Sequence, residues 1–129
     1  MHYSIDKQEK YYLFSLEEEK LDTTIAPDLK SEFVTASAEG VANMIVDLGK
    51  VKYIDSSGLS ALLVGNRVFS DNNGAFIIAA PTEHVMKLIK ISQLNNVLNI
   101  LPTTEEAVDA VFMHELEKDF KQDDESQED

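Results

Sequence analysis

The chain has 129 residues, of which 43% are hydrophobic, enough for one domain with a substantial core. Its 24 acidic residues outnumber 11 basic ones, and the formal charge of −13 argues against non-specific nucleic-acid binding and against binding to anionic membranes. The chain has no cysteine, so neither a disulfide nor a thiolate site is predicted. It contains neither a run of about 18 apolar residues nor a secretory hydrophobic region, and we expect a soluble cytoplasmic protein.

The first part of the chain predicts a β-hairpin followed by a helix. Two short β-type runs, 3–6 and 11–16, flank the charged sequence "KQEK". Ile25, Leu29 and Phe33 then recur at helical spacing, with Pro27 near the start of the helix and Gly40 at its end.

Two continuous apolar runs in the middle of the chain are typical of strands buried on both faces. They are "NMIVDLG" (43–49) and "AFIIAA" (75–80). Between them, Asp55 and two serines open a second helix, which "DNNG" (71–74) ends. The inward stripe of this helix is expected to contain Leu59, Leu62, Leu63 and Phe69.

The last part of the chain predicts two helices joined by a short strand. The first of these two helices can be capped by Thr82, and we expect its side chains Val85, Leu88 and Ile89 to face inward. The sequence "NVLNIL" (96–101) predicts the strand that follows it. The final helix begins with a Thr103–Glu106 capping box, and we expect Ala107, Val111 and Leu116 on its inner face. Residues 121–129 lack apolar side chains, so we expect a domain over 1–120 and a disordered acidic tail.

Strands that alternate with helices in this order predict an α/β fold with a mainly parallel sheet. We expect roughly four to five strands, an N-terminal hairpin at the sheet edge and about four helices.

Several site chemistries lack a signature in the sequence. The three histidines lie on unrelated elements, so no metal site is predicted. Phosphate-binding and dinucleotide-binding glycine loops and a serine-hydrolase elbow are absent, and the carboxylates are concentrated in "EEE" (17–19) and the tail. We therefore predict no catalytic residues and no cofactor.

The polar stretch Asp55-Ser56-Ser57-Gly58 has two interpretations. A serine can cap a helix and stabilise it by about 1 kcal/mol. A serine can also accept a phosphate, which adds about −1.5 to −2 charges at pH 7. The stretch follows a predicted strand, and the functional edge of an open α/β sheet lies beyond the carboxyl ends of its strands. Gly58 carries no side chain, so another backbone or a phosphate donor could approach it closely. The residues alone leave both interpretations open.

The stretch "VKYIDSSGLSALLVGNRVF" (51–69) resembles the signature of the STAS domain, as found in bacterial anti-sigma-factor antagonists. The resemblance covers roughly residues 3–116, including "VANMIVDLGKVKYIDSSGL", "NNGAFIIAAPTEHVMKLIKISQLNNVLNIL" and "EEKLDTT". The sequence "DTTIAPDLK" matches the family only loosely, and the acidic tail is an addition.

The resemblance implies a partner-switching antagonist that is a binding protein and a kinase substrate, not an enzyme. Ser56, directly after Asp55, would be the phosphoacceptor, with Ser57 as the alternative. The unphosphorylated form would bind an anti-sigma serine kinase, which uses its own ATP, and so free a sigma factor. A PP2C-type serine phosphatase would reset the cycle.

The residues expected to contact the partner surround this motif and continue along the following helix. They are Asp22, Asp55, Ser57, Gly58, Ser60, Val64 and Arg67. Val64 and Val68 could instead pack against a neighbouring helix, and Asp22 could be a cap in "LDTT".

Two other functions compete with the switch. Some STAS proteins are regulatory subunits of lipid ABC transporters or scaffolds of stress-sensing assemblies, in which the motif serine is only a contact or a cap. A small-molecule or nucleotide binder is disfavoured by the missing phosphate loop.

Overall fold

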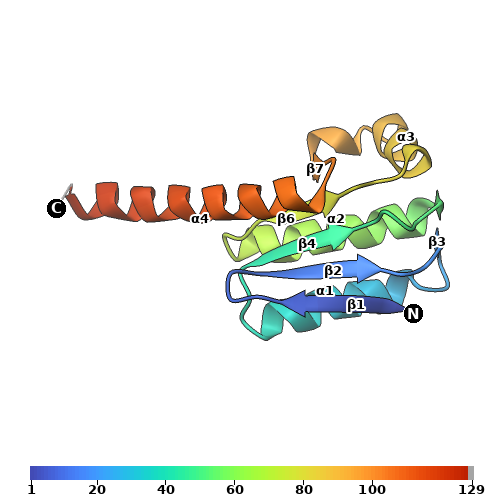
Figure 1. Ribbon diagram of the computed structural model, residues 1–129, viewed down its shortest axis with the longest axis horizontal. Helices are drawn as coiled ribbons and strands as arrows, with labels where there is room; N and C mark the ends of the chain where they lie inside the picture. The colour runs from blue at the N-terminus through green and yellow to red at the C-terminus, as the bar shows by residue number, and fades with distance from the viewer. Residues whose placement is uncertain (128–129) are drawn as a thin grey trace.

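The computed structural model describes the backbone of residues 1–127 and the side chains of residues 1–121. Four α-helices and seven strands alternate along most of the described chain (Figure 1). The helices are α1 (Ala26–Ala38), α2 (Ser56–Asp71), α3 (Glu83–Ile91) and α4 (Thr104–Gln127), with a 3₁₀ turn η1 (Leu94–Asn96). The strands are β1 (Tyr3–Lys7), β2 (Tyr11–Leu16), β3 (Lys20–Leu21), β4 (Asn43–Asp47), β5 (Tyr53–Ile54), β6 (Phe76–Ala79) and β7 (Asn99–Leu101).

Five of these strands form one mixed sheet in the order β1-β2-β4-β6-β7. The β1–β2 hairpin is antiparallel, whereas β2–β4, β4–β6 and β6–β7 are parallel pairs. This arrangement confirms the predicted α/β fold with a hairpin at the sheet edge.

Helices cover both faces of the sheet because its central strands are buried on both sides. In β4, Met44 and Val46 belong to the core that α1 and α2 cover. Ile45, between them, belongs to the second core, where Ala107 and Val111 of α4 are fully buried. Alternation of side chains along the strand therefore directs neighbouring residues into two different cores.

A second, two-stranded parallel sheet formed by β3 and β5 was not predicted. Lys20 pairs with Tyr53, and Leu21 pairs with Ile54. Strands of two residues carry no hydrophobic period that a sequence reading could detect. The pair matters because it holds the loop after β3 against the start of α2.

Helix α4 differs from the prediction in its inner face and in its length. Leu116, expected to face inward, is 50% exposed. The helix also continues past residue 120 to Gln127, through most of the segment for which we predicted disorder. Extending an existing helix needs no buried apolar residue, since each added residue gains a backbone hydrogen bond without a new nucleation cost. Glu128 and Asp129 lie outside the described residues.

Candidate functional site

The predicted site lies where β5 ends and α2 begins, next to β3 at the carboxyl-terminal edge of the sheet (Figure 1). Asp55 has an extended backbone and is the N-cap of α2, with its carboxylate accepting a hydrogen bond from the Gly58 N–H at 3.1 Å. The cap is therefore an aspartate. Of the two interpretations of this stretch, the one in which a serine caps the helix does not hold, because both serines are already inside the helix.

The two serines have different surroundings. Ser56, the first helical residue, is exposed, and its hydroxyl has no hydrogen-bond partner among the described side chains. Ser57 is half-buried, and its Oγ lies 3.0 Å from Oγ1 of Thr23 in the loop after β3. Ser56 is thus the more accessible hydroxyl of the pair.

Gly58 is buried and has a packing role inside the protein. A Cβ at this position would lie 2.4 Å from the Leu21 carbonyl oxygen and 2.7 Å from Cγ1 of Ile54. Glycine is needed because the backbone of β3 crosses the first turn of α2 at this point. The close backbone approach that we expected at Gly58 is therefore made by the chain itself.

Next to Ser56 the surface is hollowed between the starts of α1 and α2, with a volume of about 300 Å³. The lining residues are Thr23, Ala26, Pro27, Lys30, Ser56, Ser57 and Ser60. Lys30 gives this hollow a positive charge close to the serines. Thr23 and Lys30 were not predicted as site residues, because only the folded chain brings α1 beside α2. The resemblance of "LDTT" was the only signal for the loop that contains Thr23.

Asp22 organises the turn that precedes α1. Its carboxylate accepts hydrogen bonds from the hydroxyl of Thr24 at 2.5 Å and from the Thr24 N–H at 3.0 Å. These two bonds lower the pKa of Asp22 below its ordinary value. Helix α1 itself has Ile25 as N-cap, without a side-chain cap. Asp22 therefore lies beside the hollow, because the adjacent Thr23 lines it, and the Asp22 carboxylate is hydrogen-bonded to Thr24 within the turn.

Further along α2, three of the predicted contact residues continue the line of Ser56. Ser60, Val64 and Arg67 follow it at helical spacing and so share one face of α2. Arg67 is exposed, whereas Ser60 and Val64 are half-buried. Val68 packs against the buried core. Val64 is the apolar residue on this line of α2.

Neither a metal site nor a membrane segment is found in the part of the chain that the structure describes. No three or more histidine, aspartate or glutamate side chains there are placed to hold a metal ion. None of the described helices combines the length and the apolar character needed to cross a membrane. The site offers hydroxyls, a lysine and a helix start.

Comparison with known proteins gives a consistent set of similarities. The STAS domain family model matches residues 2–107. Over 86 residues the chain is 27% identical to the anti-sigma-B factor antagonist of Staphylococcus epidermidis, covering 67% of this chain and 80% of that protein.

Solved structures share the fold. The anti-sigma factor antagonist SpoIIAA superimposes in its unphosphorylated form with a TM-score of 0.73 at 23% identity, covering 85% of this chain and 96% of that one. The phosphorylated form of the Bacillus protein SpoIIAA gives a TM-score of 0.66, covering 85% of this chain and 99% of that one. The murine solute carrier 26 A9 anion transporter gives 0.71 at 11% identity, covering 84% of this chain and 18% of the transporter. On the match of the family model to most of its length, the chain belongs to the STAS domain family.

Proposed function

We propose that this protein is an anti-sigma factor antagonist that acts by partner switching, with Ser56 as the phosphoacceptor. The observation that carries the proposal is the division of roles at the start of α2: Asp55 caps the helix, and the exposed Ser56 hydroxyl is left without an internal partner among the described residues. The identity with a curated anti-sigma-B factor antagonist supports the same role.

A phosphate on Ser56 would change the surface and leave the fold intact. It would add about −1.5 to −2 charges at the amino end of α2, where the helix dipole favours negative charge. The Asp55 cap does not involve the modified hydroxyl, and Lys30 lines the adjoining hollow. A partner packed on Ser56 would meet a dianion that it must desolvate, which disfavours the complex.

The partner in this cycle is an anti-sigma serine kinase, which binds the unphosphorylated protein and so releases its sigma factor. The line Ser56, Ser60, Val64 and Arg67 along α2 supplies a continuous face for that contact. The kinase brings its own ATP, and a PP2C-type phosphatase restores the hydroxyl. The protein is thus a cytoplasmic substrate and binder without catalysis of its own.

The test uses an anti-sigma serine kinase that binds the protein, together with labelled ATP. The parent protein and Ser57→Ala should both be labelled, whereas Ser56→Ala should bind the kinase and accept no label. Ser57→Ala is the matched control because it removes the neighbouring hydroxyl from the same helical turn. Equal labelling of Ser56→Ala and the parent would contradict the assignment. Binding without labelling of any variant would favour the scaffold or transporter-subunit alternative.

A further inference from the structure

A stripe of exposed apolar side chains runs along the outer face of α4. Phe112, Leu116 and Phe120 are spaced four residues apart, so they lie on one face of the helix, and Met113 adjoins them. Their exposed fractions are 47%, 50% and 66%, with 58% for Met113. Single exposed apolar residues are ordinary, but a contiguous exposed patch marks an interaction surface.

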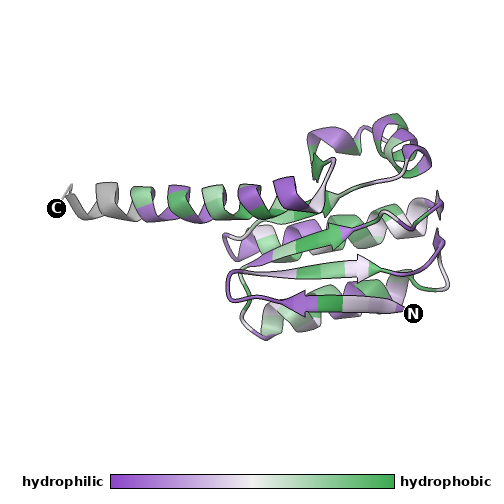
Figure 2. Ribbon diagram, viewed as in Figure 1, coloured by the Kyte–Doolittle hydropathy of each residue, from purple (hydrophilic) through white to green (hydrophobic). Residues whose placement is uncertain are grey.

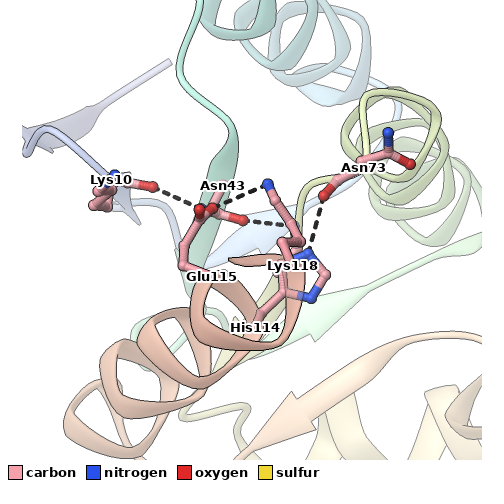
Figure 3. A network of polar contacts seen from close by, with 7 residues as sticks. Lys10, Asn43, Asn73, His114, Glu115 and Lys118 are labelled. Carbon is pink, nitrogen blue, oxygen red and sulfur yellow. Dashed lines mark hydrogen bonds and ion pairs between the residues drawn. The ribbon is translucent and has the colours of Figure 1, made fainter. Parts of the chain in front are cut away.

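The opposite face of α4 is anchored, which holds this stripe outward. Asn43 of β4 donates a hydrogen bond to Glu115 at 2.7 Å, and Lys118 pairs with Glu115 at 3.2 Å (Figure 3). His114 Nε2 lies 3.0 Å from the carbonyl oxygen of Asn73 after α2. Rotating α4 to bury the stripe would break all of these contacts.

The helix also outruns the sheet that it covers. Figure 1 shows α4 continuing beyond the amino-terminal ends of β2 and β4, and Figure 2 shows apolar residues recurring along that projecting part. Phe112 keeps an edge-on contact with Tyr11, with ring centroids 6.2 Å apart. Leu116 and Phe120 lie farther along the projection and are more exposed than Phe112.

Acidic side chains border the stripe. Glu117 lies on one side of it and Asp119 on the other, and Asp109 precedes it by one turn, all of them exposed. In the sequence of α4, acidic residues far outnumber the two lysines, Lys118 and Lys121. An occupant of this surface must therefore bring apolar side chains together with positive charge.

We propose that the outer face of α4 is a docking surface for a basic amphipathic helix of a partner protein. A second copy of this chain would bring its own net charge of −13 and the same acidic residues beside its stripe, and an anionic membrane would also be repelled. A helix with an apolar face flanked by lysine or arginine complements both features of the surface. The surface lies away from Ser56 and does not depend on the proposed switch.

The probe is a synthetic peptide of about four helical turns that carries leucine on one face and lysine on the other. Titrated into the full-length, ¹⁵N-labelled protein, it should shift amide signals of residues 109–120. Leu116→Ser with Phe120→Ser should weaken binding at least about tenfold, roughly 1.4 kcal/mol. Ile91→Ser with Val97→Ser is the matched control, because these side chains are equally exposed on α3 and after η1, and it should bind as the parent does.

A second pair of variants tests the charge. Glu117→Gln with Asp119→Asn keeps the stripe and should weaken binding and reduce its salt dependence. The proposal would be overturned if Leu116→Ser with Phe120→Ser bound the peptide as the parent does. It would also be overturned if the control variant lost as much affinity, or if the peptide shifted amide signals elsewhere in the protein. So would equal binding of a peptide with glutamate in place of lysine. Sedimentation showing a parent dimer that the stripe variant abolishes would assign the surface to a second copy instead.

Discussion

At the start of α2, three consecutive polar residues have separate roles that follow from backbone position. Asp55 precedes the helix in an extended conformation, which brings its carboxylate under the Gly58 N–H. Ser56 and Ser57 are already helical, and Ser57 is hydrogen-bonded to Thr23. The sequence could not show which residue caps, since aspartate and serine caps are about equally favourable.

Replacing Asp55 by alanine should destabilise the protein, because the Gly58 N–H loses its acceptor. We expect a loss of about 1 kcal/mol, or a fall in Tm of roughly 3–6 °C. Ser56→Ala is the control and should melt close to the parent. Thermal melts that showed the larger loss for Ser56→Ala would place the cap on the serine after all.

For Gly58→Ala, helix propensity and packing predict opposite signs. Alanine is the better helix former by about 1 kcal/mol. Its Cβ, however, would lie 2.4 Å from a backbone carbonyl of β3, and overpacking of this kind costs about 1–3 kcal/mol or more. We expect a lower Tm than the parent's, with Ser70→Ala, at an exposed site of the same helix, as the propensity control. A stabilised Gly58→Ala would show that β3 can move away.

At the scale of the elements, α4 is tied to the sheet by a buried polar residue. Asn43 is fully buried, and its side-chain amide donates to the Lys10 carbonyl and to Glu115, both at 2.7 Å (Figure 3). Its amide oxygen accepts from the Ala75 N–H at 2.7 Å. One side chain thus connects the β1–β2 hairpin, β4, the start of β6 and α4.

Removing this connection should be costly. Asn43→Ala leaves the Ala75 N–H and the Lys10 carbonyl without their partner, and a buried unsatisfied group costs about 1–3 kcal/mol. Asn72→Ala is the control, since Asn72 is exposed and its two side-chain hydrogen bonds lie at the surface. Urea unfolding should show a loss of about 2 kcal/mol or more for Asn43→Ala only. Equal losses would mean that the buried network adds nothing.

The contacts of Glu115 with Asn43 and Lys118 should make the stability of the protein depend on pH. Burial raises the pKa of Glu115, but hydrogen bonds from Asn43 and Lys118 outweigh burial and lower it below the ordinary 4.5. A pKa that is lower in the folded state gives stability that is present above 4.5 and lost as the pH falls through the folded value. Glu115→Gln should therefore flatten the acid limb of a Tm–pH profile.

Glu117→Gln is the control for that profile, since it removes the same charge from an exposed site on the same helix. Any general effect of reduced charge repulsion would appear in both variants and cancel in their difference. Identical profiles for the two variants would show that Glu115 is not coupled to folding.

How far each element could be predicted depended on its length and on what decides its position. The continuous apolar runs of β4 and β6 and the helical spacing of apolar residues in α2 were enough to predict these elements, and "DSSG" pointed to the candidate site because its residues are contiguous. The pair β3–β5 is too short to show a period. Leu116 was placed inward because the sequence does not show where the sheet ends and α4 projects. Lys30 reaches the site only through the packing of α1 on α2.

Across the whole molecule, the two proposed surfaces lie at opposite ends of the sheet. Ser56 lies at the carboxyl-terminal edge beside β3, and α4 projects beyond the amino-terminal ends of the strands (Figure 1). The five-stranded sheet lies between them. A charge added at Ser56 should therefore affect one surface and leave the other unchanged.

Ser56→Asp tests this separation together with the switch. The carboxylate supplies one negative charge where a phosphate supplies nearly two, so the effect on the kinase should be partial. An unpaired charge in a desolvated contact typically costs several kcal/mol, so we expect kinase affinity to fall at least ~10-fold. The Tm should stay close to the parent's because the helix dipole tolerates the charge and Asp55 still caps the helix.

The affinity of the α4 surface for the leucine–lysine peptide should not change in Ser56→Asp. Calorimetric titrations and a melt on one sample separate the outcomes: unchanged kinase affinity would remove the switch, and a collapsed melt would make Ser56 a structural residue.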